Sequence, residues 1–283
     1  MQIIPEPRKM QQLCAAWRCS HQTIGCVPTM GALHAGHLEL CRRAKSENER
    51  LVVSIFVNPA QFGPHEDLAR YPHPFERDCD SLRELGCDAV FAPTKEAMYG
   101  NADFVHGTWI DVTPFDELWE GVTRPGHLRG VATVVAKLFN ICSPTRAYFG
   151  EKDFQQLRMV KALVNDLFFP LEIVPCPTTR ESDGLAMSSR NAYLNPEERL
   201  SATVIFRAMN AGRDLARAGE RDVALIGQTI ERALASQPDF RVQYVAVVDA
   251  QTLCPLRELD GREARILVAG HLGKTRLIDN LAL

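Results

Sequence analysis

Short apolar runs alternate with amphipathic stretches along the first two-thirds of the chain. The runs are almost continuously apolar, which is typical of strands that are buried on both faces of a sheet. We predict strands at 23–27, 51–57, 88–92, 147–149 and 171–174. We predict helices between them at 37–46, 75–85, 130–141 and 154–167. This alternation predicts an α/β fold with a Rossmann-like, doubly wound parallel sheet.

The pattern changes in the last third of the chain. Asn195, Pro196 and Glu198 are typical of a helix start, with an Asn cap, proline in the first turn and an acid three residues after the cap. We predict a helix from this cap to about residue 218, a second at 222–236, and strands at 243–248 and 265–269. Helices and strands are segregated here, so we predict two domains: the Rossmann-like domain over 1–176 and a smaller α+β domain over 177–283.

Composition narrows the class of protein. The chain has 283 residues, of which 46% are apolar and 24% charged, as in ordinary soluble globular proteins. Its formal charge of -3 disfavours a nucleic-acid partner, because proteins that bind nucleic acids usually carry an excess of basic residues. Apolar runs are far shorter than the about 20 residues that cross a bilayer. The N-terminus lacks the apolar stretch of a signal peptide. We expect a cytoplasmic protein without a membrane partner.

Nine cysteines are the unusual feature of the composition. They stand at positions 14, 19, 26, 41, 79, 87, 142, 176 and 254. No two are separated by two residues, so the chain contains neither a zinc ribbon nor a thioredoxin-type pair. The odd count and irregular spacing also argue against a disulfide framework. We expect reduced thiols that behave as small apolar side chains.

The loop 28–37 joins the first predicted strand to its helix. In an open parallel sheet, ligands bind at the carboxyl ends of strands, where helix N-termini present N–H groups. Gly31 and Gly36 allow a ligand to approach the backbone, and His34 and His37 stand at the helix entrance. The pair would suit phosphate oxygens. Taken alone, it could also be half a metal site or two surface histidines, although no neighbouring spacing supplies a third zinc ligand.

Further polar groups follow other predicted strands. Asn58 and Gln61 come after the strand 51–57, and Lys152 and Asp153 follow 147–149. The stretch 187–190 adds two serines and an arginine, a donor set that suits an anion. Because strand ends of a parallel sheet share one edge, we expect these groups to serve one site.

The sequence Gly273-Lys274-Thr275 invites comparison with a phosphate-binding P-loop. That motif requires a glycine five residues before its second glycine, and Val268 stands there instead, inside a predicted strand. We therefore predict that this stretch has no part in nucleotide binding.

Several motifs together resemble one family over essentially the whole chain. They lie at 28–37, 54–62, 67–72, 124–127, 149–156 and 183–191. In order and spacing they resemble the pantothenate synthetases, or pantoate–β-alanine ligases, within the nucleotidyltransferase group. His34-Ala35-Gly36-His37 resembles the histidine signature of that group, and Met187-Ser188-Ser189-Arg190 resembles its phosphate-binding loop without the usual lysines.

The resemblance implies a role for each matched residue. The implied catalytic residues are His34, His37, Lys152 and Arg190. The implied ATP contacts are Met30, Gly31, Ala32, Leu33, His34, Ala35, Gly36, His37, Gly150, Glu151, Lys152, Asp153, Thr179, Met187, Ser188, Ser189 and Arg190. Pantoate and β-alanine would meet Gln61, Gln156, Met30, Phe56, Asn58 and Tyr71, with Asn58 also near the reacting phosphates. Mg²⁺ would bind through the ATP phosphates, with no ligand assigned among the protein side chains.

The resemblance also implies a reaction and a partner. Pantoate would be activated by ATP to pantoyl adenylate, and β-alanine would then displace AMP to give pantothenate. The family resemblance further implies a homodimer and a lid role for 177–283. A cofactor adenylyltransferase is the near alternative, and a catalytically silent nucleotide-binding protein is a more distant one. A tRNA-synthetase fragment is disfavoured by the charge balance.

Overall fold

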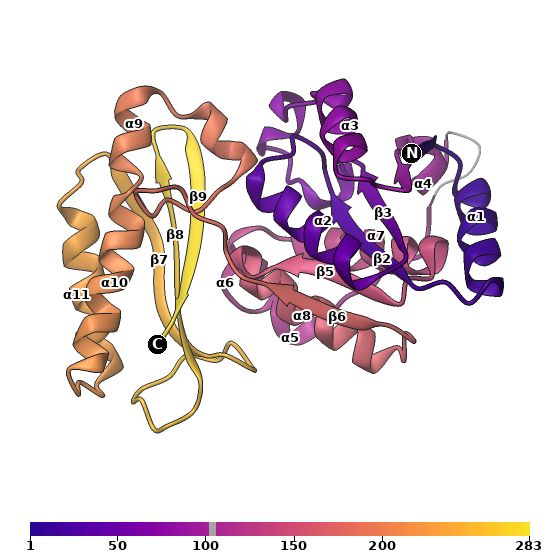
Figure 1. Cartoon of the computed structure of the whole chain (residues 1–283). Helices are drawn as coiled ribbons and strands as arrows, with labels where there is room; N and C mark the ends of the chain where they lie inside the picture. The colour runs from indigo at the N-terminus through magenta and orange to yellow at the C-terminus, as the bar shows by residue number, and fades with distance from the viewer. Residues whose placement is uncertain (102–105) are drawn as a thin grey trace. The chain divides into compact units, whose positions relative to one another are not determined.

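The computed structural model describes residues 1–101 and 106–283 (Figure 1). Contacts divide the chain into two compact units, one formed by residues 1–151 with 155–177 and the other by residues 152–154 with 178–283. No helix in the described ranges combines the length and apolar character needed to cross a membrane.

The first unit is built on a sheet of six parallel strands in the order β1-β4-β3-β2-β5-β6. Their bounds are β1 (Gln2–Ile4), β2 (Ile24–Thr29), β3 (Arg50–Ile55), β4 (Ala89–Phe91), β5 (Arg146–Gly150) and β6 (Glu172–Cys176). The predicted parallel α/β sheet is confirmed. β2 pairs with β3 on one side and with β5 on the other, so the strand order reverses beside it. In such sheets the crevice at this switch point, beyond the carboxyl ends of the strands, is where ligands bind.

Helices connect these strands. They are α1 (Pro7–Cys19), α2 (Ala35–Glu47), α3 (Phe75–Glu84), α4 (Lys95–Tyr99), α5 (Thr113–Asp116), α6 (Trp119–Thr123), α7 (His127–Cys142) and α8 (Phe154–Asp166), with 3₁₀ turns η1 (Pro59–Gln61), η2 (Asp67–Arg70) and η3 (Glu151–Asp153). Val27 of β2 belongs to the buried cluster formed with α2 and α3. Its neighbour Cys26 points to the opposite face, where Cys142 of α7 interacts with both Cys26 and Cys14 of α1. Helices therefore cover both faces of the sheet.

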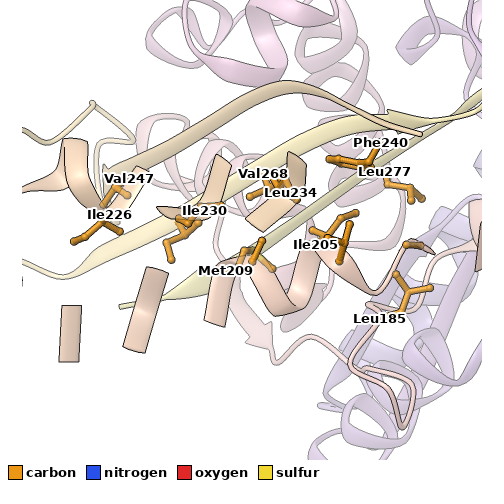
Figure 2. Close-up of a cluster of buried hydrophobic side chains, with 14 of the residues drawn as sticks. Leu185, Ile205, Met209, Ile226, Ile230, Leu234, Phe240, Val247, Val268 and Leu277 are labelled. Carbon is orange, nitrogen blue, oxygen red and sulfur yellow. The ribbon is translucent and has the colours of Figure 1, made fainter. Parts of the chain in front are cut away.

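The second unit pairs an antiparallel sheet with two long helices. The sheet has the order β7 (Phe240–Asp249), β8 (Ala264–Leu272) and β9 (Thr275–Ala282). The helices are α9 (Pro196–Ser201), α10 (Val204–Arg217) and α11 (Val223–Ala235), after the 3₁₀ turn η4 (Ser189–Tyr193). α10 and α11 lie side by side on the sheet (Figure 1). Figure 2 shows the core between them, where Met209, Ile226 and Ile230 pack against Val247 and Val268.

One prediction about this unit is wrong, and one of its strands was missed. The Asn195 cap and its reciprocal Glu198 bond are present, but the predicted long helix is broken at residues 202–203. There the backbone forms i−3 bonds, and the Thr203 hydroxyl donates to the Leu200 carbonyl at 2.7 Å, which interrupts the α-helical ladder. The third strand, β9, was not predicted. Gly273, with φ of 56°, makes the turn of the β8–β9 hairpin, consistent with excluding a P-loop.

Candidate active site

The loop after β2 is held in shape by a buried carboxylate. Gly31 and Ala32 both have positive φ, 83° and 50°. Asp78 of α3 accepts hydrogen bonds from the backbone N–H groups of Ala32, at 2.7 Å, and Leu33, at 2.9 Å. Burial raises the pKa of Asp78, although these two bonds oppose the shift. Asp78 was not predicted as a site residue, although a charged residue on the buried face of a predicted helix is a signal for such a role.

The two histidines stand at the entrance of α2. His34 is the N-cap residue and His37 the third residue of the helix, and their ring centroids are 4.0 Å apart. The backbone N–H of His34 donates to Nδ1 of His37 at 3.4 Å. In the neutral ring, this bond leaves the proton of His37 on Nε2, which makes Nε2 a donor. Ala35 and Gly36 form the first turn between them. A donor at a helix N-terminus suits phosphate.

No metal cluster accompanies this pair. Within residues 1–101 and 106–283, no group of three or more His, Cys, Asp and Glu side chains could hold a metal ion.

The turn after β3 presents Gln61 beside Met30. Asn58 is buried, and its Nδ2 donates to Oε1 of Gln61 at 3.1 Å. Nε2 of Gln61 lies 2.9 Å from the sulfur of Met30. Asn58, which is only 1% exposed, thus supports Gln61 from behind.

A cavity of about 480 Å³ opens at the carboxyl ends of β2, β3 and β4. Met30 and Phe56, two of the residues that the resemblance places at pantoate and β-alanine, both line it, together with Ile55 and Val57. Tyr71 is buried and packs edge-on against Phe62, with ring centroids 5.9 Å apart, so it supports the segment after Gln61. The structure therefore brings Met30 and Phe56 together in the lining of one cavity.

A salt-bridged arginine ties Gln61 to the start of α7. Arg124 binds both carboxylate oxygens of Glu66, at 2.7 and 2.6 Å. Its Nη1 lies 3.0 Å from Nε2 of His127, whose Nδ1 lies 2.8 Å from the carbonyl oxygen of Gln61. Gly130 packs so closely that a Cβ there would come within 2.2 Å of the Ala60 carbonyl oxygen. The motif 124–127 was noticed in the sequence, but this supporting role was not predicted.

His127 should make the protein sensitive to mild acid. Burial, with the charge of Arg124, lowers the pKa of His127 from 6.5 to about 4. As the pH falls from 6.5 towards 4, His127 is therefore protonated in the unfolded chain while it stays neutral in the folded chain. The free energy of unfolding decreases over this interval. We expect His127→Gln to reduce that loss by about 2–3 kcal/mol, measured by urea unfolding at several pH values. Exposed His65, replaced by Gln, is the control; equal pH dependence in both variants would contradict the assignment.

The two glutamines at the start of α8 have different surroundings. Gln155 is buried, and its amide bonds to the backbone of Phe115, Leu118 and Glu120 at 2.8, 2.9 and 3.0 Å. It therefore holds the segment of α5 and α6. Gln156, the predicted substrate contact, is half-buried.

Most of the remaining residues that were predicted to contact ATP lie in the second unit. The exceptions are Gly150, the last residue of β5, and Glu151, the first residue of η3, which belong to the first unit. Nζ of Lys152 lies 3.4 Å from the Asp153 carboxylate, and the lysine side chain is 19% exposed. The Lys152 carbonyl accepts from Asn280 at 2.8 Å, which anchors this turn to β9. Asp153 thus pairs with the lysine.

The predicted phosphate loop forms a compact turn. The Ser188 hydroxyl accepts from the backbone N–H of Arg190 at 3.3 Å and opens η4, which begins at Ser189. The backbone N–H of Met187 donates to the Thr179 carbonyl at 3.0 Å, so these two predicted contacts are neighbours. Within this unit, the structure therefore brings together Thr179 with the stretch 187–190.

A doubly wound parallel sheet with a histidine pair at the entrance of α2 agrees with the resemblance to the nucleotidyltransferase group of α/β proteins. The sequence model of the pantoate–β-alanine ligase family matches residues 2–282. The chain belongs to the pantoate–β-alanine ligase family.

Relatives match over nearly their full length. The chain is 53% identical to the pantothenate synthetase of Rubrobacter xylanophilus, with 99% of this chain and 98% of the relative covered. It is 49% identical to that of Moorella thermoacetica, with 100% and 99% covered. The pantothenate synthetase structure from Thermus thermophilus is 48% identical, with a TM-score of 0.93 and 99% of each chain covered. That of the Francisella tularensis ligase, complexed with beta-gamma ATP and β-alanine, is 34% identical, with a TM-score of 0.82 and 100% and 97% covered.

Proposed function

We propose that this protein joins pantoate and β-alanine at the expense of ATP. A carboxylate oxygen of pantoate attacks the α-phosphorus, the bond from that phosphorus to the departing pyrophosphate breaks, and pantoyl adenylate forms. The amine of β-alanine then attacks the acyl carbon, an amide forms, and AMP leaves with release of a proton. The observation that carries this proposal is the His34–His37 pair at the N-terminus of α2, in a chain of this family.

We assign the ATP contacts in two groups. Met30 to His37 would lie against the nucleotide, where Nε2–H of His37 and the first N–H groups of α2 would donate to phosphate oxygens. Lys152 and Arg190 would supply positive charge to the same phosphates. The other assigned contacts are Gly150, Glu151, Asp153, Thr179, Met187, Ser188 and Ser189. Together these groups would stabilise charge that develops at the transferring phosphorus.

We assign the pantoate contacts to the polar and apolar groups around the turn after β3. Gln61 and Gln156 would bind its oxygens, while Met30 and Phe56 would enclose its methyl groups. Asn58 and Tyr71 would support this site from behind. Mg²⁺ would enter with ATP as part of that substrate and neutralise phosphate charge.

The reaction can be tested by leaving out one substrate at a time. With ATP, Mg²⁺, pantoate and β-alanine, the purified protein should form AMP continuously. Omission of pantoate or of β-alanine should stop steady turnover. AMP formation that is indifferent to β-alanine would contradict ligation. An adenylyltransferase would instead release pyrophosphate and keep the adenylyl group on its product, so measuring AMP and pyrophosphate together separates the two activities.

We further propose that the protein is a cytoplasmic homodimer, as the family resemblance implies. The odd number and irregular spacing of the nine cysteines support a reducing compartment, because they do not suit a disulfide framework. Light scattering should give a mass about twice the 31.6 kDa of one chain.

A further inference from the structure

The side-chain amide of Asn58 has only one orientation that satisfies its neighbours. Its Oδ1 accepts from the backbone N–H of Ala60 at 3.3 Å, and its Nδ2 donates to the backbone carbonyl of Gly130 at 3.1 Å. A backbone N–H can only donate and a carbonyl oxygen can only accept, so exchanging the two ends of the amide would break both bonds. The side chain is 1% exposed, so water does not offer a substitute.

This orientation is passed on to Gln61. Nδ2 of Asn58 is a donor, so the Gln61 atom 3.1 Å from it is the acceptor Oε1. The other end of the Gln61 amide, the donor Nε2, therefore points to the sulfur of Met30 at 2.9 Å. A thioether sulfur is a weak acceptor. An oxygen atom of a bound substrate would be a better partner for this N–H group.

Tyr99 stabilises the same orientation from the far side. Its hydroxyl lies 2.8 Å from Oδ1 of Asn58, and because that oxygen is an acceptor, the hydroxyl is the donor. Burial raises the pKa of Tyr99 to about 12, so the hydroxyl keeps its proton. The ring stacks on Trp109, with centroids 6.0 Å apart, and Nζ of Lys137 lies 4.6 Å from the ring centre. These contacts leave the hydroxyl little freedom to turn elsewhere.

We propose that Tyr99 is a positioning residue for pantoate: through Asn58, its hydroxyl holds the Gln61 amide with the N–H₂ end towards the substrate. The site then favours an acid that offers an acceptor oxygen to Gln61. This inference rests on the proposed function, in which Gln61 contacts pantoate.

Tyr99→Phe tests the inference, because it removes the hydroxyl and keeps the ring. We expect the KM for pantoate to rise about three- to tenfold, the range of one neutral hydrogen bond. The KM values for ATP and β-alanine and the kcat should change less than twofold. The matched control is Tyr148→Phe, another buried tyrosine, whose hydroxyl bonds to Glu47 and Asn48 at 2.8 and 2.7 Å. It should lower the melting temperature without changing the KM for pantoate.

A double-mutant cycle with Gln61→Ala shows whether Tyr99 acts through Gln61. In the Gln61→Ala background, Tyr99→Phe should have no further effect on kcat/KM for pantoate. An equal loss in both backgrounds, or an unchanged KM in the single variant, would overturn the proposal. The same assay measures whether AMP formation by the wild-type protein depends on both pantoate and β-alanine. A failure of the proposed ligase reaction is therefore distinguished from a failure of the proposal for Tyr99.

Discussion

Replacing His37 with alanine should lower kcat for AMP formation about 10²–10³-fold, as expected when a preorganised donor to a developing charge is lost. The structure gives the reason: the bond from the His34 backbone to Nδ1 leaves Nε2 of His37 as the donor at the N-terminus of α2. The loss should fall on the first half-reaction, so exchange of labelled pyrophosphate into ATP, with pantoate present, should slow by the same factor.

The control for this variant is His21→Ala. His21 is exposed and precedes β2, at the opposite end of the strand from the candidate site, so its replacement should leave the rate unchanged. Circular dichroism and thermal melting should show both variants folded. A His37→Ala protein that exchanges pyrophosphate at the wild-type rate would place the chemistry elsewhere.

Lys152→Ala should also reduce kcat, by about 10²-fold or more, because a largely shielded ammonium would no longer neutralise the phosphates. Lys152→Arg should recover only part of the rate, since a planar guanidinium cannot occupy the place of a compact ammonium. The rates of both variants are measured by pyrophosphate exchange and by steady-state AMP formation.

Lys274→Ala is the matched control for Lys152. This lysine is exposed in the turn between β8 and β9, within the stretch that superficially resembles a P-loop. Its removal should leave kcat and the KM for ATP unchanged. If Lys274→Ala lost activity and Lys152→Ala did not, the assignment of the phosphate contacts would be wrong.

Much of the first unit could be predicted because its strands are short apolar runs with clear ends. Five of its six strands lie within a few residues of their predicted positions. β1 was missed because it has only three residues and depends on pairing with β4 at the sheet edge. α1 was missed because it buries only Met10 and Cys14, although Pro7 in its first turn was a readable signal. The local sequence pattern is least able to predict a helix or strand that depends on pairing or packing with a distant part of the chain.

The same limit applies to the candidate site. The residues of contiguous motifs, such as His34 and His37, could be named from the sequence. Asp78 and Tyr99 could not, because each acts on a residue more than 40 positions away, Asp78 on Leu33 and Tyr99 on Asn58. No spacing rule connects such pairs; they meet only because parallel strands bring their following loops to one edge of the sheet.

The free cysteines allow the opening of the first unit to be followed without an added probe. Seven of the nine are buried, and all seven belong to the first unit; the exposed ones are Cys19 and Cys254. A thiol reagent should therefore modify two sites quickly in the native protein and reach the others only when the sheet and its helices separate. The slow phase of labelling would report how often this unit opens under native conditions, and binding of a substrate to it would appear as a slower phase.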